Sequence, residues 1–319
     1  MSAPDLSPFP SRRSRRTRGT GRLVTISFLS LATLSNMRAN PINLSTLQLV
    51  GTAQLVSGNV LRLTDTTDPT LNSGGPALAG AAWTTTRFDV ADPFSISFDF
   101  QMSDFKGNID NDGSGGDGIA FVIQNSDAGS NALGVGSGGI GFLGIKDSVA
   151  VMLDAYKNNF YYGDPSGHYV GVNTRGTEAN YPHHFCRDNK LTSDPSQGTD
   201  VPDVFCTSDP SLGLSGPIAF DDGKVHTASL LYNPGTLNVY VDSMLALSVA
   251  LNLADTLSLA NGTGAYLGFT SGTRGSYQNN DVLDFAYTPV PEPATGAACF
   301  VALSILAAIA SKRKKMEGR

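Results

Sequence analysis

The chain has 319 residues, of which 40% are hydrophobic and only 16% are charged, and its formal net charge at pH 7 is −6. Residues 40–288 alone contain ten basic and 25 acidic residues, because the other basic residues lie near the two ends. A central region with this excess of negative charge repels nucleic-acid phosphates, so nucleic acid is excluded as a partner.

Residues 1–39 have the pattern of a signal peptide. Six arginines lie between Arg12 and Arg22, and an apolar run at 23–34 follows them. A basic region followed by a short apolar segment is typical of an export signal. The pair Arg15-Arg16 also allows the twin-arginine route, although no apolar residues follow it at once. We expect an exported protein whose mature chain begins between residues 36 and 40.

Residues 40–288 are dominated by short β-type runs. In residues 94–100, Phe and Ile alternate with Ser and Asp, which indicates a strand with one buried face. Turn residues such as Asn233-Pro-Gly235 separate such runs. Many short strands without helical periodicity predict one all-β domain, an antiparallel β-sandwich of two sheets. The other expected strands lie at 55–63, 119–123, 149–153, 169–172, 226–232, 237–241, 245–251, 266–270 and 282–287.

Residues 154–168 have the composition of a calcium loop. The strand-like run at 148–153 leads directly to Asp154, and carbonyl, carboxamide and further carboxylate oxygens follow within eleven positions. Hard oxygen ligands of this kind suit Ca²⁺. The acidic loop 110–117 superficially resembles an EF-hand, but its twelfth position is Phe121 where a Glu is needed, so we exclude that motif.

Two Gly-rich segments precede this loop, at 116–123 and 139–145. With the calcium loop, in this order, they resemble the L-type (legume-like) lectins over roughly residues 42–288. The resemblance implies a concanavalin-like jelly roll and a calcium-dependent sugar site. By position in the family motifs, the sugar ligands are the Asp117 carboxylate, the Gly141 backbone N–H, the Asn158 amide and the Tyr156 ring. The implied calcium ligands are Asp154, the Tyr156 carbonyl, Asn158 and Asp164.

One position departs from the plant members of that family. They carry a Glu two residues before the first calcium Asp, and this chain has Met152 there. A thioether cannot replace a carboxylate on a hard transition metal. We therefore expect calcium alone and no second, manganese-type site, although His168 falls near the place of its histidine ligand.

An irregular insertion is expected at about 176–216. Cys186 and Cys206 lie within it, and in an oxidising exported setting they are candidates for a disulfide. A segment of this length is too long for an ordinary loop. We expect the pair to act as a staple for it.

Residues 289–319 combine a Pro291-Glu292-Pro293 box, an apolar span at 294–310 and a basic tail. This order resembles a PEP-CTERM sorting signal. The resemblance implies retention in the membrane through one transmembrane helix, and cleavage near the box by an exosortase-type enzyme. A plain C-terminal membrane anchor is the alternative.

The sequence favours a non-enzymatic lectin of the bacterial cell surface or extracellular polysaccharide matrix, with a glycan or exopolysaccharide as partner. A structural matrix module that does not bind sugar is the alternative. A glycoside hydrolase is less favoured, because it needs paired carboxylates and Glu occurs only at 178, 292 and 317.

Overall fold

The computed structural model describes residues 40–56, 58–67, 76–110, 113, 115–158, 164–182 and 211–290. The predicted signal peptide, Cys186, Cys206, the Pro-Glu-Pro box and the apolar span at 294–310 lie outside these residues. Within the described ranges, no helix has the length and apolar content needed to cross a membrane.

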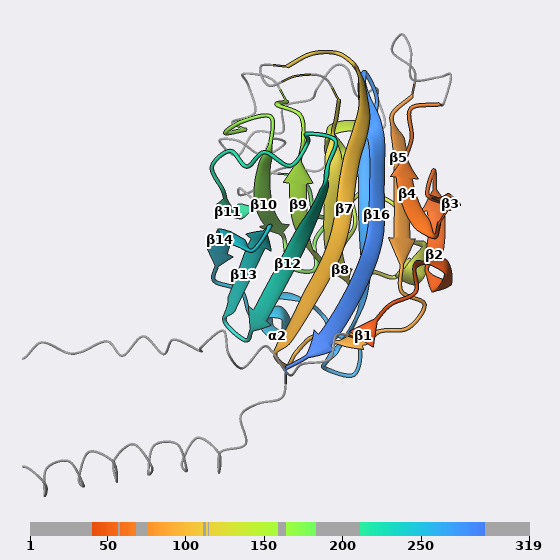
Figure 1. Ribbon diagram of the computed structural model, residues 1–319. Helices are drawn as coiled ribbons and strands as arrows, with labels where there is room; N and C mark the ends of the chain where they lie inside the picture. The colour runs from red at the N-terminus through yellow and green to blue at the C-terminus, as the bar shows by residue number, and fades with distance from the viewer. Residues whose placement is uncertain are drawn as a thin grey trace, which may run out of the picture. The chain divides into compact units, whose positions relative to one another are not determined.

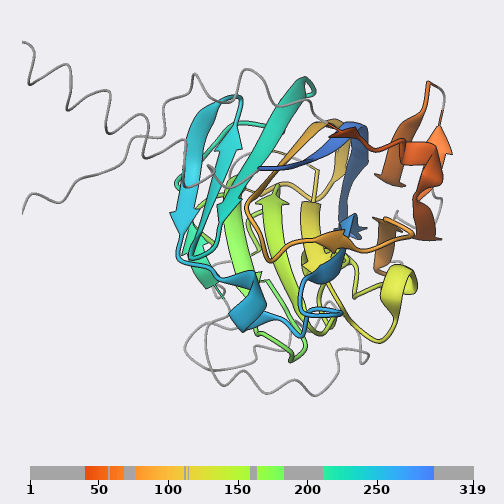
Figure 2. The ribbon, with the colours of Figure 1, turned by 90° about the horizontal axis from the view of Figure 1, so that it is seen from below.

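Two antiparallel sheets face each other, so the predicted two-sheet sandwich is confirmed (Figures 1 and 2). The first, called the β7 sheet, has the strand order β14 (Met244–Val249), β13 (Thr236–Val241), β12 (Val225–Asn233), β7 (Phe94–Gly107), β16 (Ser276–Pro289), β4 (Val60–Thr64) and β3 (Gln54–Val56), and β1 (Asn40–Pro41) pairs with β16. In Figure 1 this sheet lies in front of the second one.

The second, called the β8 sheet, has the order β11 (Ser211–Leu214), β10 (Tyr169–Thr174), β9 (Ser148–Asp154), β8 (Gly118–Gln124), β15 (Gly264–Thr273), β5 (Leu78–Trp83) and β2 (Gln48–Gly51), and β6 (Phe88–Asp89) pairs with β15. The described connections contain four one-turn helices: η2 (Leu44–Thr46), η3 (Gly129–Asn131), η4 (Ser137–Gly139) and α2 (Leu253–Thr256).

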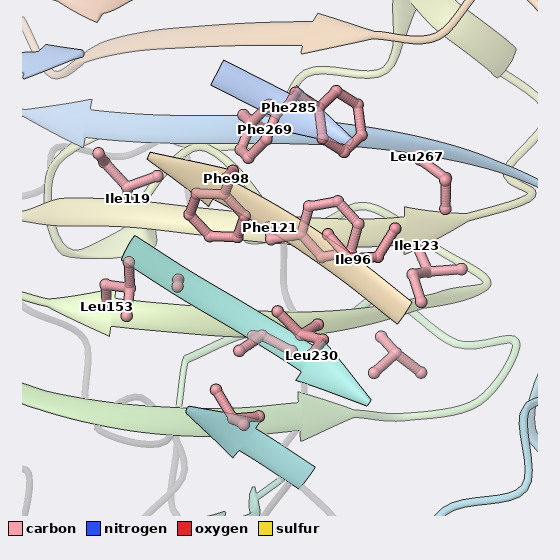
Figure 3. Close-up of a cluster of buried hydrophobic side chains, with 14 of the residues drawn as sticks. Ile96, Phe98, Ile119, Phe121, Ile123, Leu153, Leu230, Leu267, Phe269 and Phe285 are labelled. Atoms are coloured by element: carbon pink, nitrogen blue, oxygen red, sulfur yellow. The ribbon is translucent and has the colours of Figure 1, made fainter. Parts of the chain in front are cut away.

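Alternating apolar residues from both sheets form the main core (Figure 3). Phe98 of β7 and Phe285 of β16 meet Phe121 of β8 and Phe269 of β15, with ring centroids 4.9 Å apart for Phe269 and Phe285. Such aromatic contacts add to the hydrophobic free energy of burial. This packing fixes the two sheets face to face.

A second apolar cluster covers the other face of the β8 sheet. Trp83, Phe142 and Met152 belong to it, and the Trp83 indole N–H donates to the Ala132 carbonyl at 2.7 Å. The cluster holds the loop between β8 and β9 against the sheet. The middle of that loop, at Gly141, approaches β15 at Ser271, near the predicted site.

Three predictions from the sequence need correction. The run expected at 55–63 is a hairpin, because Gly58 and Asn59 both adopt positive φ angles, +77° and +64°, as in a tight turn between β3 and β4. The expected insertion at 176–216 is partly regular, since β11 pairs with β10 near its end. The last strand is also longer than expected, because a bulge between Val282 and Asp284 interrupts its alternation.

His226 ties the start of β12 to the turn between β13 and β14. Its Nδ1 lies 2.7 Å from a carboxylate oxygen of Asp242, and its Nε2 lies 3.0 Å from one of Asp222. Burial lowers the pKa of His226, but the hydrogen bonds to the two carboxylates outweigh burial, so its pKa is raised above 6.5.

A group whose pKa is raised on folding stabilises the folded protein below its unfolded-state pKa and loses this contribution as pH rises through the folded-state value. We therefore expect Asp242→Asn to lower the free energy of unfolding more at pH 6 than at pH 8.5. Urea denaturation of both proteins at the two pH values measures this. An equal loss at both values would contradict a charged His226.

Candidate functional site

The predicted site lies at one end of the β8 sheet, where the neighbouring strands β8 and β9 begin and end. Asp117 directly precedes β8, and Asp154 is the last residue of β9. The register pairs Gly118 with Asp154, and Asp154 with Tyr169 of β10. The Asp117 carbonyl accepts a hydrogen bond from the Ala155 amide at 2.9 Å. The antiparallel ladder thus brings the two aspartates together.

Asp117 is also joined to β15. Its amide donates to the Gly272 carbonyl at 3.0 Å, and Asp117 is only 3% exposed. The peptide bond between Gly116 and Asp117 is cis. A Cβ placed on Gly116 would lie 3.0 Å from Cβ of Tyr156, so this segment packs against the predicted calcium loop. Asp117 therefore sits between β15 and the loop that follows β9.

The four predicted calcium ligands belong to one hydrogen-bonded loop. A carboxylate oxygen of Asp154 accepts from the Tyr156 amide at 3.1 Å, and one of Asp164 accepts from the Asn158 amide at 2.9 Å. The Asn158 side-chain amide lies 3.2 Å from the Tyr156 carbonyl.

The electrostatics of these residues fit a cation. Burial, and then the charges of Asp164 and Asp117, raise the pKa of the fully buried Asp154 carboxyl well above its ordinary value. The Tyr169 hydroxyl donates to Asp164 at 2.8 Å, and burial together with the two carboxylates raises the pKa of Tyr169. A divalent cation bound by hard oxygens would relieve this repulsion. The donor set therefore fits Ca²⁺.

Carboxylates alone do not complete the site. In the described part of the chain, no three His, Cys, Asp or Glu side chains form a group that could hold a metal ion. Calcium binding here would depend on the Tyr156 carbonyl and the Asn158 side chain as well as on Asp154 and Asp164. Such mixed oxygen ligation is common for Ca²⁺.

A second, manganese-type site is predicted to be absent, and the residues near its expected position make other contacts. Met152 is fully buried, and its sulfur accepts a hydrogen bond from the Asn173 side chain at 3.1 Å. Nδ1 of His168 lies 3.7 Å from a carboxylate oxygen of Asp221. The absence of a transition-metal site remains a prediction.

The loop that carries Gly141 lies near the Asp117 segment, but the Gly141 amide already donates a hydrogen bond within the loop. A Cβ on Gly141 would lie 2.6 Å from the Ser271 carbonyl, one residue from the Gly272 that binds Asp117. The Gly141 amide donates to the Val135 carbonyl at 2.9 Å. A sugar oxygen would therefore have to share or displace this hydrogen bond, which the sequence did not reveal.

The sequence also missed a role for Asp110. One of its carboxylate oxygens accepts from the Lys157 amide at 2.6 Å, and the other accepts from the Gly113 amide at 3.0 Å. The acidic loop before β8 thus holds the backbone of the predicted calcium loop between Tyr156 and Asn158. An Asp three residues before a Gly is a usual turn signal, but it does not identify this second partner.

Comparisons with known proteins identify the family and the fold of the chain. A model of the legume lectin domain family matches residues 34–297. The lectin of Bauhinia forficata in complex with GalNAc is similar in structure, with a TM-score of 0.55, 17% identity and coverage of 80% of this chain and 98% of that one. Lectin I of Ulex europaeus, in complex with the methyl glycoside of α-L-fucose, has a TM-score of 0.54, 19% identity and coverage of 80% and 98%.

The exoplasmic/lumenal domain of VIP36 is also similar. In its Ca²⁺- and Man3GlcNAc-bound form it gives a TM-score of 0.50, with 16% identity and coverage of 78% of this chain and 86% of that one. Likeness at these identities shows the fold.

We expect Asp154→Asn to lower calcium affinity at least about tenfold, because it removes one of two ligand charges. Isothermal titration of the full-length chain with CaCl₂ measures the effect. Asp147→Asn is the control, since Asp147 is also buried but its carboxylate binds the Ser258 amide elsewhere. An unchanged calcium titration in folded Asp154→Asn would argue against this loop.

Proposed function

We propose that this chain, which belongs to the legume lectin domain family, is a calcium-dependent carbohydrate-binding protein without enzymatic activity. The observation that carries the proposal is the placement of Asp117. Its amide is bound to Gly272 of β15 and its carbonyl to Ala155 of the calcium loop. The carboxylate that the family resemblance assigns to sugar is thereby held beside the proposed metal ligands.

The chemistry of the proposed site follows from its residues. The Asp117 carboxylate accepts hydrogen bonds from two sugar hydroxyls, and the Asn158 amide donates one. The Tyr156 ring offers an apolar face to the C–H groups of a sugar. When bound, calcium neutralises the carboxylates of Asp154 and Asp164 and fixes the orientation of Asn158. A ligand group fixed before binding loses less conformational freedom on binding.

The similar structures support this proposal through their ligands. The Bauhinia forficata lectin was solved with GalNAc, the Ulex europaeus lectin with a fucose glycoside, and VIP36 with Ca²⁺ and a mannose-containing glycan. These ligands differ, so the proposal for this chain extends to a glycan and not to one named sugar.

We extend the proposal to location. The export pattern in residues 1–39 and the Pro-Glu-Pro box with its apolar span support export, membrane anchoring and processing by an exosortase-type enzyme. The protein would then act at a bacterial cell surface or in the polysaccharide matrix. An exopolysaccharide is a suitable partner there, because repeated sugars allow several weak sites to act together.

A second function has one observation in its favour. The Gly141 amide, which the family resemblance assigns to sugar, donates to the Val135 carbonyl instead. A sandwich of this kind that binds no sugar would be a structural module of the matrix. The experiment below separates the two functions.

We expect the full-length chain to bind a glycan array in calcium and to lose binding in chelator. Asp117→Asn should reduce binding at least about tenfold, because it replaces a charged acceptor by a neutral amide. Asp92→Asn, at an exposed aspartate before β7, is the control and should bind normally. Absence of binding by folded wild-type protein in both conditions would favour the structural module.

A further inference from the structure

The core between the two sheets becomes polar at the end that carries Asp117. Along β15 the inward row passes from Leu267 and Phe269 to Ser271, and all three are fully buried. Along β16 it passes from Val282 to Asn280 and Gln278, which are also fully buried. Burying polar groups is unfavourable unless they are hydrogen-bonded, so this local change of character has a structural reason.

These polar side chains form one chain of hydrogen bonds across the sandwich. The Gln278 amide nitrogen donates to Asn280 at 3.0 Å, and the Asn280 nitrogen donates to the Thr64 hydroxyl of β4 at 2.9 Å. The Thr64 and Ser271 hydroxyls are 3.2 Å apart, and Ser271 donates to the Gly118 carbonyl at 2.7 Å. Because Ser271 uses its single proton there, Thr64 is the donor in the hydrogen bond between the two hydroxyls. The Thr64 hydroxyl also lies 3.5 Å from the Gln278 carbonyl, which is a longer contact than the one to Ser271. With Thr64 donating to Ser271, the protons of the network point toward Gly118.

The other end of this hydrogen-bond network, at Gln278, contacts the backbone segment that precedes Asp117. A Cβ on Gly115 would lie only 2.4 Å from Oε1 of Gln278, and Gly115 has a φ of +109°. Oε1 of Gln278 is buried and has no hydrogen-bond partner among the described residues. The network thus contacts residues 115 and 118, on both sides of Asp117.

We propose that four side chains act as positioning residues for the sugar-binding carboxylate of Asp117: Gln278, Asn280, Thr64 and Ser271. The inference rests on the proposed function. Apolar residues of similar size could fill the same space without polar partners. A directional network instead fixes where the Gly118 carbonyl lies, and the Asp117 backbone is bonded to Gly272 beside it. The β7 sheet, which contributes Thr64, Asn280 and Gln278 to the network, would thereby influence sugar affinity.

The test uses three variants of the full-length, ¹⁵N-labelled chain. Thr64→Val keeps the shape of the side chain and removes the hydroxyl, whereas Thr64→Ser keeps the hydroxyl. Thr84→Val is the matched control, because Thr84 is also buried and its hydroxyl accepts from the Leu267 amide, farther along β15. The measurements are the amide signals of Asp117 and Gly118, calcium affinity, and affinity for N-acetylgalactosamine and mannose in saturating calcium.

We expect Thr64→Val to shift the amide signals of Asp117 and Gly118 and to weaken sugar binding about tenfold, which corresponds to about 1.4 kcal/mol. Calcium affinity should not change. Thr64→Ser should restore both properties, and Thr84→Val should alter neither, even if it lowers the unfolding temperature. A role confined to stability would not produce this pattern.

Unchanged amide signals in Thr64→Val, or shifted signals with unchanged sugar affinity, would overturn the inference. If the wild-type protein binds neither sugar and the signals still shift, the orienting role stands and the proposed function fails for those sugars. If Thr64→Val does not fold, Gln278→Met tests the far end of the network with the same expected direction.

Discussion

The site depends on the burial of one carboxylate at the end of a central strand. Asp154 closes β9 with no exposed surface, and Asp164 and Asp117 lie close enough to raise its pKa further. An isolated charge in such a place is strongly unfavourable, so the surrounding loop must supply polar partners. The Tyr156 amide donates to Asp154, and the Tyr169 hydroxyl donates to the neighbouring Asp164. The same constraint that shapes the loop therefore creates a donor set suited to calcium.

Hydrogen bonds to main-chain groups hold this loop in place from two sides. Asp110 binds the Lys157 amide from the acidic loop, and Asp117 binds Ala155 from the start of β8. Apolar packing between Phe98, Phe121 and Phe269 holds the two sheets together in the core. It does not fix the positions of the polar atoms at the Asp117 end of the sheet. The sandwich thus has an apolar part that provides stability and a polar end that determines where individual atoms lie.

The sequence predicted the sandwich because the alternation of apolar and polar residues along strands such as 94–100 can be recognised without knowing the tertiary contacts. It also placed Asp154 directly after a strand, and the family resemblance assigned Asp117 to the same site. It could not show that the Gly141 amide binds Val135, because hydrogen bonds inside a Gly-rich loop depend on backbone angles that the glycines leave open. The β11 strand was hidden in a polar insertion, since its pairing with β10 is a tertiary contact. In the sequence, Gln278 and Asn280 are indistinguishable from ordinary polar residues. Their network could not be predicted, because it continues to Thr64 of β4 and Ser271 of β15.

The backbone around Asp117 also limits how new variants of this protein can arise. Gly118 has a φ of +132°, and a Cβ there would lie 2.2 Å from the Leu153 carbonyl. Any larger residue at this position would separate β8 from β9 and distort the edge that holds both aspartates. In a library of mutants selected for a different glycan, this position should stay glycine whatever the ligand. Changes in preference would have to come from loops that can vary in length and sequence, while the segment that carries Asp117 stays constant.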